Sequence, residues 1–141
     1  MRTAITSCFL LPLALSGVPA AAAQFDGKQD LLCSAFRMFE CDMANGCTAV
    51  TPAELGASSS WIVNAKKKTI TGTNPNAQPN DIDRMELLDG KLFMSGIQDG
   101  VPEERDGVAW SVSINNPDGV MTIMVAGEGL GVVGLGSCVP R

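Results

Sequence analysis

The side chains that could do chemistry in this sequence are mainly carboxylates, hydroxyls, thiols and two tryptophans, because its 141 residues include no His and no Tyr. These absences remove the commonest general base near neutral pH, the commonest metal ligand and a phenolic acid. Serine catalysis lacks its activating His, and the SxxK spacing of a Ser-Lys pair does not occur. We therefore expect a protein that is not an enzyme, with no catalytic residues, no cofactor and no metal site.

Acidic residues gather in one irregular stretch, residues 98–106, which contains Asp99, Glu103, Glu104 and Asp106. Their spacing does not match the alternating Asp/Asn pattern of a calcium-binding loop, and a mixture of charges of this kind usually stays in water. We expect a solvated loop that could bind a partner. An inhibitor of an extracytoplasmic hydrolase would present such a loop to a basic cleft. A carboxylate-based hydrolase is the second alternative.

A glycine pattern near the end of the chain, residues 129–134, matches GxGxxG letter for letter. A dinucleotide-binding turn needs a following helix and a further strand, and only seven residues follow the pattern here. We interpret these glycines as part of strands that bend or approach another backbone closely.

The tryptophans are the residues best suited to binding a small molecule. A Trp in the mouth of a barrel can line a ligand pocket, and Trp61, which follows a Ser-rich segment, is our candidate for a possible ligand pocket. Trp110 alternates with aliphatic residues and is expected in the core.

The N-terminal residues 1–23 are typical of a signal peptide. Arg2 precedes a mostly apolar core, and small residues before Gln24 suit a signal peptidase. The apolar core is too short to span a bilayer, so we expect no transmembrane anchor after cleavage and a periplasmic or secreted protein. Removal of residues 1–23 takes away Arg2 and no acid, which changes the formal net charge from −5 to −6. An acidic chain of this kind argues against a nucleic-acid partner.

Four of the five cysteines lie beyond the signal peptide, and in an exported chain they predict two disulfides. If Cys33 and Cys41 share a helix, their spacing places them about 12 Å apart, which is too far for a disulfide. The Asn-Gly pair between Cys41 and Cys47 can fold those two residues together. We predict the pairs Cys41 with Cys47 and Cys33 with Cys138.

These residues need elements that position them, and the apolar pattern predicts one helix followed by strands. Asp26 can cap a helix up to Glu40, in which apolar residues recur at helical spacing. From Trp61 onward the period changes to two, and turns such as Asp89-Gly90 separate about seven strands.

The expected fold is mainly β, with an N-terminal helix followed by an antiparallel meander that closes into a small, disulfide-linked barrel. A two-sheet sandwich is the alternative. We treat residues 24–141 as one β-rich domain. In size, expected export and strand succession the chain resembles small disulfide-linked barrels of the bacterial periplasm, which include lysozyme inhibitors. This resemblance concerns architecture alone, and it implies no site residues.

The sequence favours a non-enzymatic binding or envelope-associated protein. Its partner would be an unknown protein or a small apolar ligand. An inhibitor of a lysozyme or protease remains an alternative.

Overall fold

Ten β-strands form the described part of this computed structural model, which covers residues 25–100, 103 and 106–141. The strands are β1 (Leu31–Asp42), β2 (Gly46–Val50), β3 (Ser60–Asn64), β4 (Thr69–Gly72), β5 (Pro79–Asp81), β6 (Arg84–Leu88), β7 (Lys91–Gln98), β8 (Val108–Asn115), β9 (Val120–Gly127) and β10 (Leu130–Pro140). The signal peptide expected for residues 1–23 lies outside the described ranges. Within those ranges, no helix is long and apolar enough to cross a membrane.

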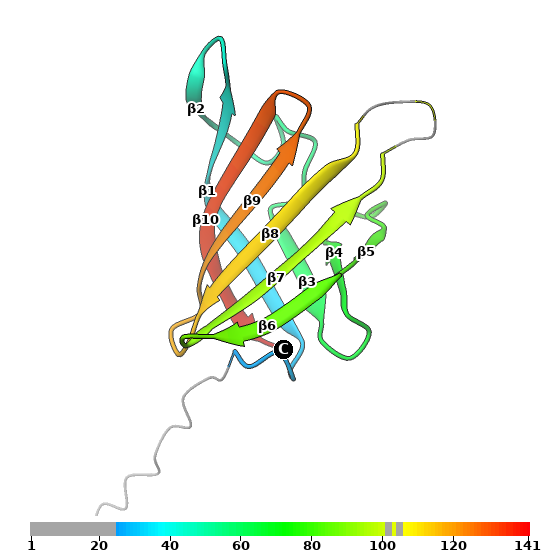
Figure 1. Ribbon diagram of the computed structural model, residues 1–141, viewed down its shortest axis with the longest axis vertical. Helices are drawn as coiled ribbons and strands as arrows, with labels where there is room; N and C mark the ends of the chain where they lie inside the picture. The colour runs from blue at the N-terminus through cyan, green and yellow to red at the C-terminus, as the bar shows by residue number, and fades with distance from the viewer. Residues whose placement is uncertain (1–24, 101–102, 104–105) are drawn as a thin grey trace, which may run out of the picture.

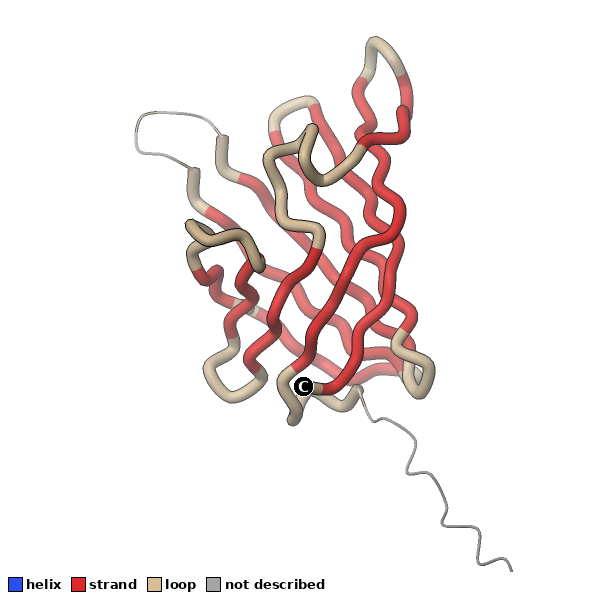
Figure 2. Tube along the Cα trace, turned by 180° about the vertical axis from the view of Figure 1, so that it is seen from behind, coloured by secondary structure: helices blue, strands red, loops and turns tan. Residues whose placement is uncertain are grey.

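All ten strands belong to one antiparallel sheet, in the order β5-β4-β3-β1-β10-β9-β8-β7-β6, with β2 added to β1. The sheet curls into a half-barrel (Figure 1), so the prediction of a mainly β, antiparallel fold is confirmed. The described strands form one curled sheet rather than a closed barrel or a two-sheet sandwich. Figure 2 shows the same curl from behind. The short strand β5 lies against β7, and Asn80 Nδ2 on β5 donates a hydrogen bond of 3.3 Å to Gln98 Oε1 on β7.

The predicted N-terminal helix is wrong, because residues 31–42 form strand β1. Leu31 and Cys33 point inward, as alternate residues of a strand do, and Met38 is the next fully buried position. The register of β1 against β10 shifts between Ala35 and Arg37, which is a β-bulge. The extra residue breaks the period of two and leaves Phe36 72% exposed.

The strands predicted after Trp61 are confirmed as β3, β4 and β6 to β10. The predicted turn at Asp89-Gly90 is one of their connections. Asp89 and Gly90 join β6 to β7 with φ values of 49° and 71°, as a two-residue hairpin turn requires. The glycine pattern at residues 129–134 falls in the β9–β10 hairpin: Gly129 lies in the turn with a φ of 70°, and the rest belongs to β10.

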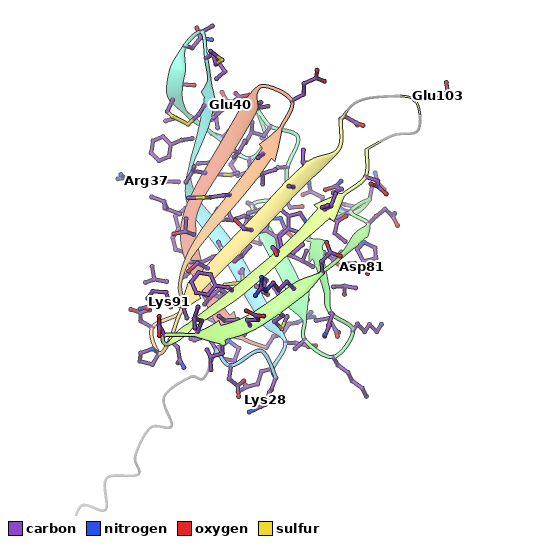
Figure 3. The ribbon with its side chains drawn as sticks, viewed as in Figure 1. Lys28, Arg37, Glu40, Asp81, Lys91 and Glu103 are labelled. Carbon is purple, nitrogen blue, oxygen red and sulfur yellow. A yellow bond between two sulfur atoms is a disulfide. The ribbon has the colours of Figure 1, made fainter. Side chains whose placement is uncertain are left out.

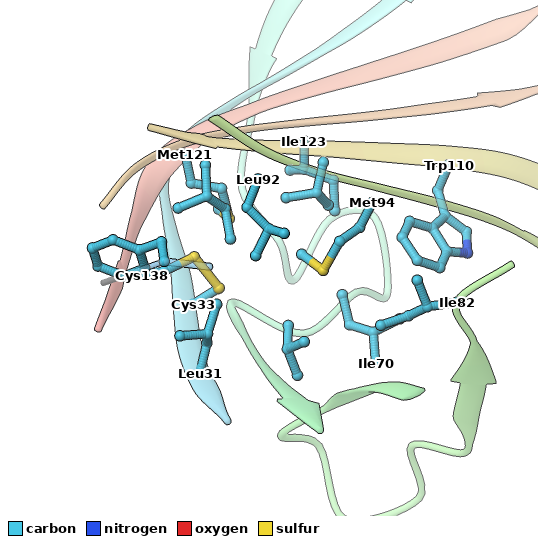
Figure 4. Close-up of a cluster of buried hydrophobic side chains, with 14 residues drawn as sticks. Leu31, Cys33, Ile70, Ile82, Leu92, Met94, Trp110, Met121, Ile123 and Cys138 are labelled. Atoms are coloured by element: carbon cyan, nitrogen blue, oxygen red, sulfur yellow. A yellow bond between two sulfur atoms is a disulfide. The ribbon is translucent and has the colours of Figure 1, made fainter. Parts of the chain in front are cut away.

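Inward side chains of the curled sheet stack in rows that follow the strand register. One row contains Met121, Ile114 and Leu92, and the next contains Ile123, Val112 and Met94. Each of these six residues is no more than 7% exposed, and several line one cluster in Figure 4. These rows fill the end of the half-barrel where both chain termini of the described fold lie (Figure 1). The core therefore occupies one end of the sheet.

The structure pairs Cys33 with Cys138 and Cys41 with Cys47. Both pairs join residues directly opposite on neighbouring antiparallel strands. Cys33 and Cys41 lie on the extended strand β1 and not on the predicted helix. Eight residues of strand span about 26 Å, so Cys33 and Cys41 are separated even further than a helix would place them.

Candidate ligand-binding cavity

The half-barrel holds a cavity of about 760 Å³ at the end opposite the Cys33–Cys138 disulfide. This volume lies within the range of about 300 to 1,000 Å³ typical of small-molecule sites. The described lining residues are all apolar or neutral polar: Met38, Leu55, Gly56, Ala57, Ser58, Trp61, Ile70, Gly72, Asn74, Pro75, Asn76, Ala77, Gln78, Asn80, Gln98, Val108, Trp110, Ile123, Val125, Leu130 and Val132.

The floor and one wall of the cavity come from the strands. The row above Ile123 consists of Val132, Val125, Trp110 and Gly96, which are register neighbours on β10, β9, β8 and β7. Gly96 carries no side chain, so the large indole of Trp110 fits against its backbone. The packed core ends at this row, and the cavity begins here.

The opposite wall comes from two loops, residues 51–59 before β3 and residues 73–78 before β5. The loops are joined where the Asn74 backbone N–H donates to Ser58 Oγ at 3.2 Å. Ser58 is 7% exposed, so this bond satisfies a buried hydroxyl. Several amide side chains, among them Asn76 and Gln78, line the cavity from the second loop. The wall formed by the strands is therefore mainly apolar, whereas the loops carry most of the neutral polar groups.

No charged side chain lines the cavity among the described residues. The nearest acidic residue by register is Glu40, which lies beside Val132 on β1 but does not line the cavity. A charged ligand would lose hydration here without gaining an ion pair. The site therefore suits an uncharged molecule.

Both tryptophans line this cavity. The expected position of Trp61 at a pocket is matched by its place in the lining, although ligand binding there stays a prediction. Trp110 lies in the core as expected, with 7% exposure, and it also reaches the cavity, which the sequence did not indicate. Its Nε1 is shielded from solvent and has no hydrogen-bond partner among the described residues. In Figure 4 this nitrogen lies on the edge of the ring that faces away from the disulfide.

The acidic loop predicted as a partner-binding surface connects β7 to β8 at the same end of the sheet as the cavity. Asp99, Glu103 and Asp106 are exposed, and Glu104 lies outside the described residues. Figure 3 shows Glu103 well away from the strands. Arg37 on β1 also points outward in this view. These carboxylates do not line the cavity, and their role in binding a partner stays a prediction.

Other carboxylates have structural roles in turns. The Val120 backbone N–H and the Asn115 side chain donate hydrogen bonds to Asp118, and these bonds lower the pKa of its carboxyl group. The side chain and backbone of Asn45 and the backbone of Ala44 lower the pKa of Asp42 in the same way. Across the described ranges, no group of three or more His, Cys, Asp or Glu residues is arranged to hold a metal ion.

Comparison with known proteins found no matching family model, no similar curated protein and no similar solved structure. The two disulfides suggest a location outside the cytoplasm, where thiols are oxidised. The class that the fold itself defines is a disulfide-linked antiparallel half-barrel with a cavity at one end.

Proposed function

We propose that this protein binds a small, largely apolar molecule in the cavity of the half-barrel, and that it does so without catalysing a reaction. The observation that carries this proposal is a cavity of about 760 Å³ whose lining combines two tryptophans, aliphatic side chains and neutral amides. Such a lining supplies apolar contact area and a few orienting hydrogen bonds, which is how small-molecule sites work. We further propose a periplasmic or secreted protein, in keeping with its two disulfides and the signal-like residues 1–23.

The lining also favours binding over catalysis. Among the described residues that line the cavity, only Ser58 carries a hydroxyl, and that oxygen already accepts a hydrogen bond from the Asn74 backbone. No carboxylate, lysine or thiol from the described residues is available in the lining to activate it.

A pair of fluorescent probes tests the proposal. N-phenyl-1-naphthylamine is neutral, and 1-anilinonaphthalene-8-sulfonate has the same aromatic body with a negative charge. We expect one neutral probe to bind per chain, and we expect the anion to bind more weakly. The chain has two Trp and no Tyr, and both Trp line the cavity, so energy transfer from tryptophan to the bound probe reports proximity to the site.

The variant Val132→Lys places a positive charge in this uncharged cavity, and Val133→Lys is its matched control on the opposite face of β10. We expect Val132→Lys to weaken the neutral probe about tenfold, or about 1.4 kcal/mol, and Val133→Lys to leave it nearly unchanged. Circular dichroism checks that both variants fold. Absence of neutral-probe binding, or an equal effect of both substitutions, would show that the cavity is not the binding site.

A further inference from the structure

The strongest chemical feature of the cavity is the unpaired indole N–H of Trp110. The side chain is more than nine-tenths buried, its Nε1 lacks an acceptor among the described residues, and the residue lines the cavity. An indole nitrogen can only donate a hydrogen bond. Leaving a buried donor unpaired costs free energy, which an acceptor brought by a ligand would recover.

Resting on the proposed function, we infer that the ligand is an uncharged molecule with an apolar body and a hydrogen-bond acceptor, such as a ketone, ester or ether oxygen, that accepts the Nε1–H of Trp110. A pure hydrocarbon would leave this donor unpaired. A carboxylate or an ammonium ion would be desolvated in a lining with no opposite charge.

Gly96 lets the edge of the indole that carries Nε1 pack closely against the β7 backbone, and because Nε1 is shielded from solvent, a ligand reaches it only when a neighbouring side chain moves. Gly96 is the register partner of Trp110 on β7, and a Cβ at this position would lie 2.7 Å from Trp110 Cζ2 and 2.9 Å from Cε2, the atom bonded to Nε1. The absence of a side chain therefore leaves this edge of the ring against bare backbone. The next residue on the same face of β7 is Gln98, which is exposed and is held by one hydrogen bond of 3.3 Å from Asn80. A side chain held this weakly can rotate when a ligand enters.

Three probes of similar size separate the ligand classes: 4-phenyl-2-butanone carries a neutral acceptor, butylbenzene carries none, and 3-phenylpropanoate is an anion. Nuclear magnetic resonance of the indole Nε1–H groups reports the hydrogen bond directly, and the chain has only two such groups. The variant Trp61→Phe assigns them. We expect the ketone to shift the Trp110 indole proton downfield, and we expect butylbenzene not to produce this shift.

Affinities measured by displacement of N-phenyl-1-naphthylamine give the second readout. Because butylbenzene is intrinsically more apolar, the ratio of ketone affinity to butylbenzene affinity is compared between proteins, which cancels that difference. We expect Trp110→Phe to lower this ratio about fivefold and Trp61→Phe to leave it unchanged. The anion should compete least in every folded variant.

The outcomes separate this inference from the proposed function. If N-phenyl-1-naphthylamine binds but the ketone does not shift the Trp110 indole proton, the inference about the hydrogen bond is overturned, whereas the proposed binding function is retained. Preference for the anion over the ketone also overturns the inference. If no neutral probe binds the wild-type protein, the proposed function fails first. If Trp110→Phe does not fold, the resonance measurement on the wild-type protein decides alone.

Discussion

At the scale of single residues, Gly96 shows how a missing side chain makes room for Trp110, which lines the cavity. An added Cβ would lie 2.6 Å from the Asp81 carbonyl oxygen as well as within 3 Å of the Trp110 ring. Both neighbours are constrained, since one is backbone and the other is a buried indole. A methyl group at this position cannot be accommodated without moving β5 or the ring.

We therefore predict that Gly96→Ala destabilises the protein by about 1 to 3 kcal/mol and weakens N-phenyl-1-naphthylamine binding. Urea denaturation and probe titration measure the two effects. The control is Gly131→Ala, also in a strand, where the nearest atom to a new Cβ is the Val125 oxygen at 3.9 Å. If both substitutions are equally harmful, close approach at Gly96 is not the cause.

Asp118 carries a residue-scale prediction about pH. Its pKa is lowered by hydrogen bonds from the Val120 backbone and the Asn115 side chain. A carboxyl group with a lowered pKa in the folded state stabilises the protein above its unfolded pKa, and this contribution is lost as the pH falls through the folded pKa. Below the ordinary value of 3.8, Asp118→Asn should therefore lose less stability on acidification than the wild-type protein. Urea denaturation over a range of acidic pH tests this, and parallel pH profiles would contradict it.

At the scale of elements, β1 shows where sequence patterns succeed and where they fail. The later strands alternate regularly, so their period of two and their Gly-containing turns could be predicted from the sequence. In β1, the bulge between Ala35 and Arg37 interrupts the period of two. The exposed Leu32 and Phe36, together with the buried Leu31, then give apolar residues at helical spacing. A bulge is set by the partner strand, so this long-range cause is invisible in a local pattern.

The candidate site was predictable only in part, for a related reason. Trp61 could be proposed because an aromatic residue near a barrel mouth is suited to binding. The amides of residues 74–80 have no spacing that marks them as a site, and they become a cavity wall only because their loop lies across from β7 to β10. The unpaired nitrogen of Trp110 depends on three-dimensional packing and has no sequence signal.

The two disulfides give an element-scale prediction. Cys33–Cys138 links residues 105 apart in the sequence, and Cys41–Cys47 links residues six apart. The chain-entropy account gives about 4 to 5 kcal/mol for the long loop and about 2 kcal/mol for the short one. Urea denaturation should therefore show that Cys33→Ala with Cys138→Ala destabilises the protein more than Cys41→Ala with Cys47→Ala. Equal losses would contradict a role for loop length.

At the scale of the whole molecule, one end of the half-barrel is packed and the other holds the cavity. Phe25 is 2% exposed and packs at the packed end, where its ring comes within 2.6 Å of the position a Gly119 Cβ would occupy. The turn at Gly119 has a φ of 71°, and it brings the backbone against the ring. The segment just before β1 thus helps to close this end.

We predict that Phe25→Ala destabilises the protein by about 3 to 5 kcal/mol, as large-to-small substitutions of buried aromatic residues do. The cavity lies at the far end, so probe affinity under conditions where the variant is folded should change little. Thermal denaturation and probe titration at low temperature separate these effects. The matched control is Phe93→Ala, because Phe93 is 41% exposed and its loss should cost less. A large fall in probe affinity for folded Phe25→Ala would show that the two ends are coupled.

The pairing of β1 with β10 also sets an order of events during folding. Strands β6 to β9 pair with their sequence neighbours, so they can pair before distant parts of the chain are in place. One edge of β1 instead stays unpaired until β10 is in place, because β10 lies between β1 and β9. Until β10 pairs with them, β1 and β9 each have an unpaired edge, and such edges can associate with other chains. The Cys33–Cys138 bond can form in its native position only after β1 and β10 have paired, so this disulfide reports that the sheet has assembled.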